Sequence, residues 1–134
     1  MKIGKIADGI AVLASFSLLW LPKIFPVCTI TGKSPMHCFF TYQAEFMIAL
    51  LAFIIALSLF FTKAAETKYL IGFLLFLIGI IIIVLPARWA IGICVPADSP
   101  CQVTTAWTTG AAVILALSGL IGAWTVGKKT KEEK

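Results

Sequence analysis

The stretch from Ser34 to Phe46, SPMHCFFTYQAEF, contains the side chains of this chain that are best suited to chemistry. Met36, His37 and Cys38 are consecutive thioether, imidazole and thiol groups, which suit Cu(I) or haem iron. Such a site requires reduced cysteine, and the sequence has one histidine and offers Met36 no Met-x-x-Met spacing. Copper or haem handling at these three residues is therefore an alternative hypothesis, and we assign no cofactor.

The four cysteines fall into two pairs, each within a polar segment between long apolar runs. Cys28 and Cys38 share the first segment, and Cys94 and Cys101 share the second. Paired thiols outside the membrane tend to be oxidised, and a bond across a short loop stabilises a fold by about 2–3 kcal/mol. We expect structural disulfides. The simplest pairing is within each segment, although four cysteines allow three pairings.

A redox role for these cysteines is the second alternative. One cysteine pair in each outer segment resembles the layout of the DsbB-type quinone reductases, which carry a CxxC pair that tunes the thiol potential. Here nine residues separate Cys28 from Cys38, and six separate Cys94 from Cys101. The alternative function is thus a quinone-linked membrane thiol–disulfide redox protein with different spacing.

Glu45 is the acidic residue of the opening stretch. Thr41 is suited to cap the helix that follows, which would place Glu45 in the first turn, where the helix dipole favours a negative charge. A carboxylate at membrane level is costly without a partner. Arg88 follows the third apolar run and is available at similar depth, so we expect a Glu45–Arg88 ion pair.

Four apolar runs must position these residues. The chain of 134 residues is 60% hydrophobic and 13% charged, far from the composition of a soluble domain. Each run is long enough to cross about 30 Å of hydrocarbon as a helix. The sequence predicts one all-α membrane domain, 1–134, as a polytopic four-transmembrane-helix antiparallel bundle. The expected helices are about 6–25, 44–61, 69–86 and 105–126, with outer loops 27–43 and 87–104 and a basic tail 127–134.

The distribution of basic residues predicts the orientation. Eight lysines lie before the first run, between the second and third, and after the fourth, whereas only Lys23, Lys33 and Arg88 lie in the other connections. The positive-inside rule then places both termini in the cytoplasm and the cysteine-containing loops outside the cell membrane, extracellular or periplasmic. The basic tail fits anionic lipid better than nucleic acid, so we expect no nucleic-acid partner.

Small residues in the runs indicate close helix packing. The fourth run has Thr108, Ala112 and Ala116 at four-residue steps, and the third has Gly72 and Gly79. These stripes favour bundle packing, although a partner could also dock there. The sequence contains no phosphate loop, nucleophile elbow or zinc signature, which argues against an enzyme.

The motif MHCFFTYQAE, with IGICVPADSPCQ before the last run, resembles the membrane family named domain of unknown function 4418. Met36, Cys38, Thr41, Ala44 and Glu45 match its pattern, whereas Phe39 stands where the family has histidine. The resemblance implies a four-helix membrane chain, and it also implies that such chains are often neighbours of MacB-type ABC transporter subunits. We therefore expect a small integral membrane accessory or interaction subunit, with the lipid bilayer and an ABC transporter subunit as partners.

Overall fold

The computed structural model describes residues 2–24, 37–87, 90 and 100–132, with the backbone alone at 22, 37–39, 100 and 101. Four α-helices make up this part of the chain: α1 (Lys2–Ile24), α2 (His37–Phe61), α3 (Ala65–Val84) and α4 (Pro100–Glu132). The described residues include no strand. The all-helical prediction is thereby confirmed for these residues. Its physical reason is that in lipid a helix satisfies its own backbone polar groups.

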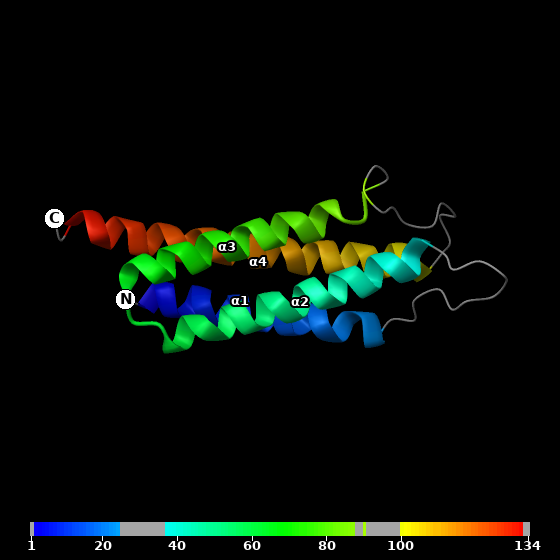
Figure 1. Ribbon diagram of the computed structural model, residues 1–134, viewed down its shortest axis with the longest axis horizontal. Helices are drawn as coiled ribbons and strands as arrows, with labels where there is room; N and C mark the ends of the chain where they lie inside the picture. Colours follow the sequence, from blue (N-terminus) through cyan, green and yellow to red (C-terminus); the bar gives the residue numbers. More distant parts are fainter. Residues whose placement is uncertain (1, 25–36, 88–89, 91–99, 133–134) are drawn as a thin grey trace.

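The helices form an up-and-down bundle in which each helix runs antiparallel to its neighbours. α1 packs on α2 and α4, and α3 packs on α4 and, less extensively, on α2. α1 begins and α4 ends at the same end of the bundle (Figure 1). We call this the lysine end; the other end, where α2 and α4 begin, is the cysteine end. A connection of three residues, Thr62–Ala64, joins α2 to α3 at the lysine end.

The tightest interface is the seam between α3 and α4, where two helices meet through glycine. A Cβ atom on Gly72 would lie 2.8 Å from the carbonyl oxygen of Gly119, and one on Gly119 would lie 2.7 Å from that of Gly72. About two turns further along α3, a Cβ on Gly79 would lie 2.8 Å from the Cβ of Ala116. These small residues bring the two backbones together, as the predicted stripes require.

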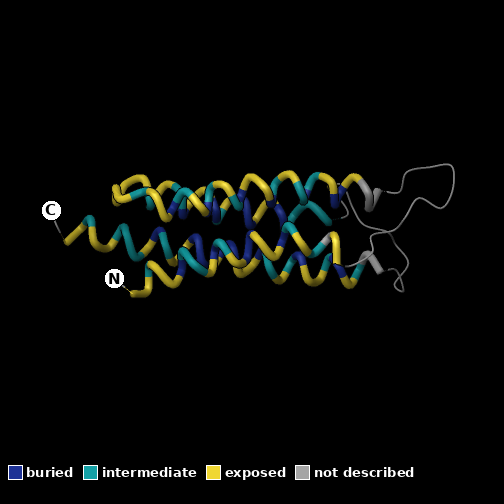
Figure 2. Tube along the Cα trace, turned by 90° about the horizontal axis from the view of Figure 1, so that it is seen from below, coloured by how far each residue is buried: buried dark blue, intermediate teal, exposed yellow. Residues whose placement is uncertain are grey.

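Apolar side chains fill the middle of the bundle and also cover its outside. Leu75, Ile82 and Leu115 are fully buried among alanines of α1, α2 and α4. Figure 2 shows the buried positions facing the axis and the exposed positions facing outward. The exposed positions carry many large aliphatic and aromatic side chains. All four helices are long and apolar enough to cross a membrane, so the outer surface suits a lipid bilayer.

The helix ends differ from the expected spans. α2 begins at His37 rather than near 44, so Thr41 lies inside the helix and is not its N-cap. α3 begins at Ala65, which places Glu66 in its first turn, where the dipole favours an acid. α4 continues to Glu132, so the basic segment expected as a tail is helical. Lysine is a good helix former and is favoured near a helix C-terminus, which explains this extension.

Candidate functional site

Glu45 is buried between the helices near the cysteine end. Its side chain is 4% exposed, and its Oε2 has no hydrogen-bond partner among the residues that the structure describes. Glu45 lies within the apolar span of α2, Phe40–Phe61. An ionisable group at such a position is costly to bury and points to a function or to a partner group.

Polar side chains of α2 and α4 surround this part of the bundle. The hydroxyl groups of Tyr42 and Thr105 lie 3.1 Å apart and join the two helices. Thr41, Thr104 and Thr108 are also buried. The Thr108 hydroxyl donates to the carbonyl of Thr104 at 2.9 Å, which satisfies it within its own helix. The second and third turns of α2 and α4 therefore form a polar layer near the cysteine end.

Half of the residues of the predicted sites lie outside the described residues. This applies to Met36, Cys28, Cys94 and Arg88, so the disulfides and the Glu45–Arg88 pair stay predictions. The backbones of His37, Cys38 and Cys101 are described, and they lie in the first turns of α2 and α4, at one end of the bundle (Figure 1). Among the described side chains, no group of three or more His, Cys, Asp or Glu residues could hold a metal ion.

An apolar groove runs along the outside of the bundle between α1 and α4, in the half nearer the cysteine end. Its volume is about 820 Å³. Phe16 and Trp20 of α1 form one wall, where their rings contact each other in a tilted arrangement with centroids 6.1 Å apart, and Trp107 of α4 forms the other. Ala106 and Gly110 lie four residues apart on α4 within the groove, and both are exposed. We call this surface the α1–α4 groove.

The groove and the polar layer were not predicted as sites. Trp20 and Trp107 are far apart in the sequence, and the side-by-side position of α1 and α4 is needed to bring them together. A signal was present, because Ala106 and Gly110 have the small-xxx-small spacing of helix contacts in membranes. Sequence alone does not tell which face of α4 remains exposed.

The fold and these sites define a small four-helix membrane protein. The chain belongs to the family Domain of unknown function (DUF4418), whose model matches residues 10–125. This match includes the motif with Thr41 and Glu45, the groove and the glycines of the seam. Neither the curated proteins nor the solved structures provided a match.

Proposed function

We propose that this chain is a small integral membrane accessory subunit whose α1–α4 groove docks a transmembrane helix of a partner protein. The partner that we expect is an ABC transporter subunit of the MacB type. The observation that supports this proposal is the exposure of a small-xxx-small pair, Ala106 and Gly110, on the lipid-facing side of α4. In lipid, such pairs allow a second helix to approach closely.

The walls of the groove support the same proposal. Trp20 and Trp107 are 52% and 60% exposed, and large aromatic side chains are frequent anchors of protein interfaces. The glycines of the seam already pack within the bundle, whereas a Cβ on Gly110 would meet nothing within 4 Å. The groove thus has small residues that the bundle itself does not use. Disulfides in the cysteine-bearing segments would brace the adjacent end for a partner's outer domain.

Site-specific photo-crosslinking in native membranes tests this docking. A photoreactive amino acid replaces Trp107 in the groove or, as a control, Ile54, which is exposed on α2 outside it. We expect an adduct with an ABC transporter subunit from position 107 and none from position 54. Gly110→Leu should reduce the adduct about ten-fold, because overpacking a close contact costs on the order of 1–3 kcal/mol. The matched variant Gly122→Leu, in the same helix but outside the groove, should leave it unchanged.

An adduct that forms equally at both positions, or that Gly110→Leu does not reduce, would contradict the proposal. Adducts with lipid alone would mean that acyl chains fill the groove.

Quinone-linked thiol redox is the second candidate, because the same apolar groove lies at the end of the bundle where Cys38 and Cys101 begin their helices. An apolar, aromatic-walled surface suits a quinone ring. Disulfides that a thioredoxin-like protein cannot reduce would exclude this candidate.

A further inference from the structure

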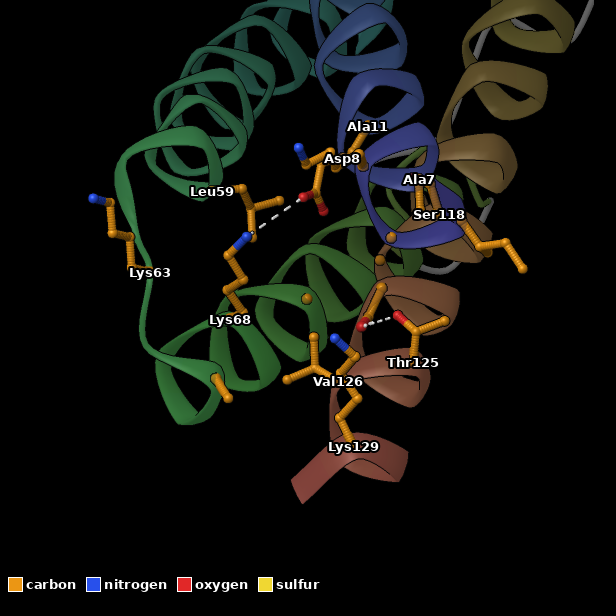
Figure 3. Close-up of a pocket in the computed structure, with 17 residues that line it drawn as sticks. Ala7, Asp8, Ala11, Leu59, Lys63, Lys68, Ser118, Thr125, Val126 and Lys129 are labelled. Carbon is orange, nitrogen blue, oxygen red and sulfur yellow. Dashed lines mark hydrogen bonds and ion pairs between the residues drawn. The ribbon is translucent and has the colours of Figure 1, made fainter. Parts of the chain in front are cut away.

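A cavity of about 410 Å³ opens at the lysine end, opposite the cysteine end. α1, α2, α3 and α4 all contribute to its lining, together with the α2–α3 connection (Figure 3). The docking proposal does not use this cavity, so the inference drawn from it is independent of that proposal.

The floor of the cavity is made of small residues with no hydrogen-bonding groups to spare. Ala7, Ala11, Gly72 and Gly119 are buried there. The two hydroxyl groups of the lining form their hydrogen bonds within α4. Ser118 Oγ donates to the carbonyl of Leu115 and Thr125 Oγ1 to that of Gly122, each at 2.9 Å. The floor therefore suits apolar atoms.

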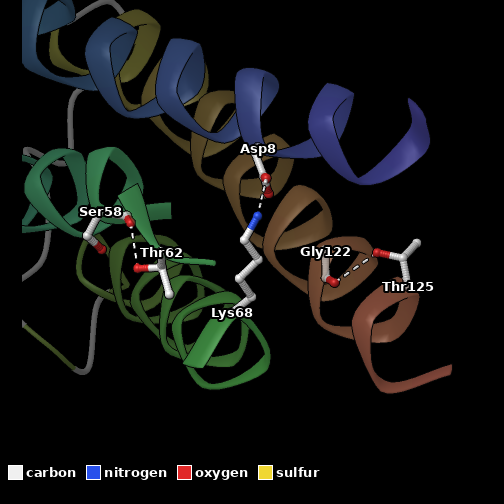
Figure 4. A network of polar contacts seen from close by, with 6 residues as sticks. All are labelled: Asp8, Ser58, Thr62, Lys68, Gly122 and Thr125. Atoms are coloured by element: carbon white, nitrogen blue, oxygen red, sulfur yellow. Dashed lines mark hydrogen bonds and ion pairs between the residues drawn. The ribbon is translucent and has the colours of Figure 1, made fainter. Parts of the chain in front are cut away.

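The rim of the cavity is cationic. Four lysines and one aspartate line it, a formal charge of +3: Lys5, Lys63, Lys68, Lys129 and Asp8. Lys68 Nζ lies 3.9 Å from Asp8 Oδ2, and this contact directs the ammonium group across the mouth (Figure 4). Lys63 extends away from the cavity (Figure 3). Within residues 2–24, 37–87 and 100–132, Lys5 and Lys129 form no ion pair.

The cavity lies near one end of the four helices that are long and apolar enough to cross a membrane, the level at which headgroups meet acyl chains in a bilayer. Asp8 lies about 9 Å along α1 from Lys2, at 1.5 Å per residue. Cationic groups above an apolar floor at such a boundary fit a phosphate group attached to an apolar body, and basic pockets between membrane helices bind anionic headgroups. Lysine acts on phosphate as a point charge with three donors.

We infer that the lysine-end cavity is a binding site for a phosphate ester, with Lys5, Lys68 and Lys129 contacting the phosphate oxygens. An anionic phospholipid headgroup and a soluble phosphate share this chemistry. The apolar floor favours the lipid, whose glycerol and first acyl carbons would lie against Gly72 and Gly119.

Native mass spectrometry of the purified full chain in mild detergent tests the site. The probes are phosphatidylglycerol, neutral phosphatidylcholine and inorganic phosphate. We expect one phosphatidylglycerol per chain in preference to phosphatidylcholine. The variant Lys5→Gln/Lys129→Gln should weaken its retention by about ten- to thirty-fold, from the loss of two favourable charge contacts. The control Lys2→Gln/Lys128→Gln removes the same charge from the same helices, outside the cavity, and should have little effect.

A second variant tests the space rather than the charge. A Cβ on Gly122 would meet only Asp8 Oδ1, at 3.9 Å, so the side chain of Gly122→Leu can enter the cavity without displacing a helix. It should reduce retention of phosphatidylglycerol, whereas Gly110→Leu should not. Gly122→Leu should therefore weaken lipid retention and leave partner docking unchanged, whereas Gly110→Leu should weaken partner docking and leave lipid retention unchanged.

The outcomes separate the two sources of phosphate. Retention of phosphatidylglycerol that inorganic phosphate does not displace assigns a lipid headgroup, and binding of inorganic phosphate itself assigns a soluble phosphate; both support the site. Binding of neither probe would overturn the inference. Equal losses in the two double-lysine variants would also overturn it, because general surface charge would then explain the binding.

Discussion

At the scale of single residues, Glu45 is the group whose surroundings raise the sharpest question. Its Oε2 has no partner among the described residues, although Tyr42 and Thr105 nearby bind each other. A buried carboxyl oxygen without a donor is destabilising. α3 ends at Val84, at the end of the bundle where α2 begins, and Arg88 follows four residues later in the sequence.

We predict that Glu45 and Arg88 are energetically coupled. In a double-mutant cycle of Glu45→Gln and Arg88→Gln, the coupling should be about 1–3 kcal/mol, since either single change leaves the other charge unpaired. The measurement is unfolding of the purified protein in mixed detergent micelles. Glu66→Gln, at an exposed acid of α3, is the matched control and should be additive with Arg88→Gln. If the effects of Glu45→Gln and Arg88→Gln were additive as well, Arg88 would not be the partner of Glu45.

At the scale of helices, the seam between α3 and α4 depends on the absence of side chains at two positions. The prospective Cβ of Gly119 lies 2.7 Å from the carbonyl oxygen of Gly72 and 2.9 Å from the amide nitrogen of Phe76. Both neighbours are backbone atoms, which cannot move aside without moving a helix. The seam is therefore the part of the bundle least able to accept even one methyl group.

We predict that Gly119→Ala destabilises the protein by about 1–3 kcal/mol, because it overpacks the seam. Gly110→Ala makes the same chemical change in the same helix, where a Cβ would meet nothing within 4 Å. It should be neutral or stabilise by up to about 1 kcal/mol, from the better helix propensity of alanine. Unfolding in mixed micelles measures both variants, and equal effects would show that the seam does not govern stability.

The helices could be predicted from the sequence, whereas several of their ends could not. The apolar runs reveal where a helix must cross lipid, but α2 extends back to His37 and α4 on to Glu132, through residues that are mostly polar or charged. Helix propensity and dipole effects decide those turns, and hydropathy does not detect them. Gly72 and Gly79 could be predicted as packing residues, because in lipid small residues mark the places where two helices approach closely.

At the scale of the whole molecule, the two ends of the bundle differ in chemistry. The lysine end contains the start of α1, the end of α4 and the cationic cavity. The cysteine end contains the polar layer around Glu45. The described lysines that predict the orientation and the backbones of Cys38 and Cys101 therefore lie at opposite ends. Orientation in the membrane can be tested without perturbing the bundle.

We predict that an impermeant maleimide applied to intact cells labels Cys28, Cys38, Cys94 and Cys101 only after a reductant, because these residues face outside as disulfides. The control is Lys63→Cys, in the short α2–α3 connection at the other end. Without reductant, this thiol should be labelled only after the membrane is permeabilised. Labelling of Lys63→Cys in intact cells would reverse the orientation, and native thiols that react without reductant would rule out the disulfides.

The sites were harder to predict than the fold for a physical reason. Lys5, Lys68 and Lys129 are far apart in the sequence, and each appeared only as a marker of the inner side of the membrane. The order of helices around the bundle brings them to one rim. Likewise, the partner of Asp8 is Lys68, which lies sixty residues away in the sequence and is brought opposite it by α3.

The glycine seam also gives a means of recognising distant relatives of this chain. A Cβ on Gly72, Gly79 or Gly119 would meet backbone atoms of the facing helix within 3.0 Å, so a smaller partner residue cannot make room for it and the helices would have to separate. Restriction of size at these positions should therefore outlast similarity elsewhere in the chain. It offers a fingerprint of this architecture even where the cysteines and lysines have been replaced.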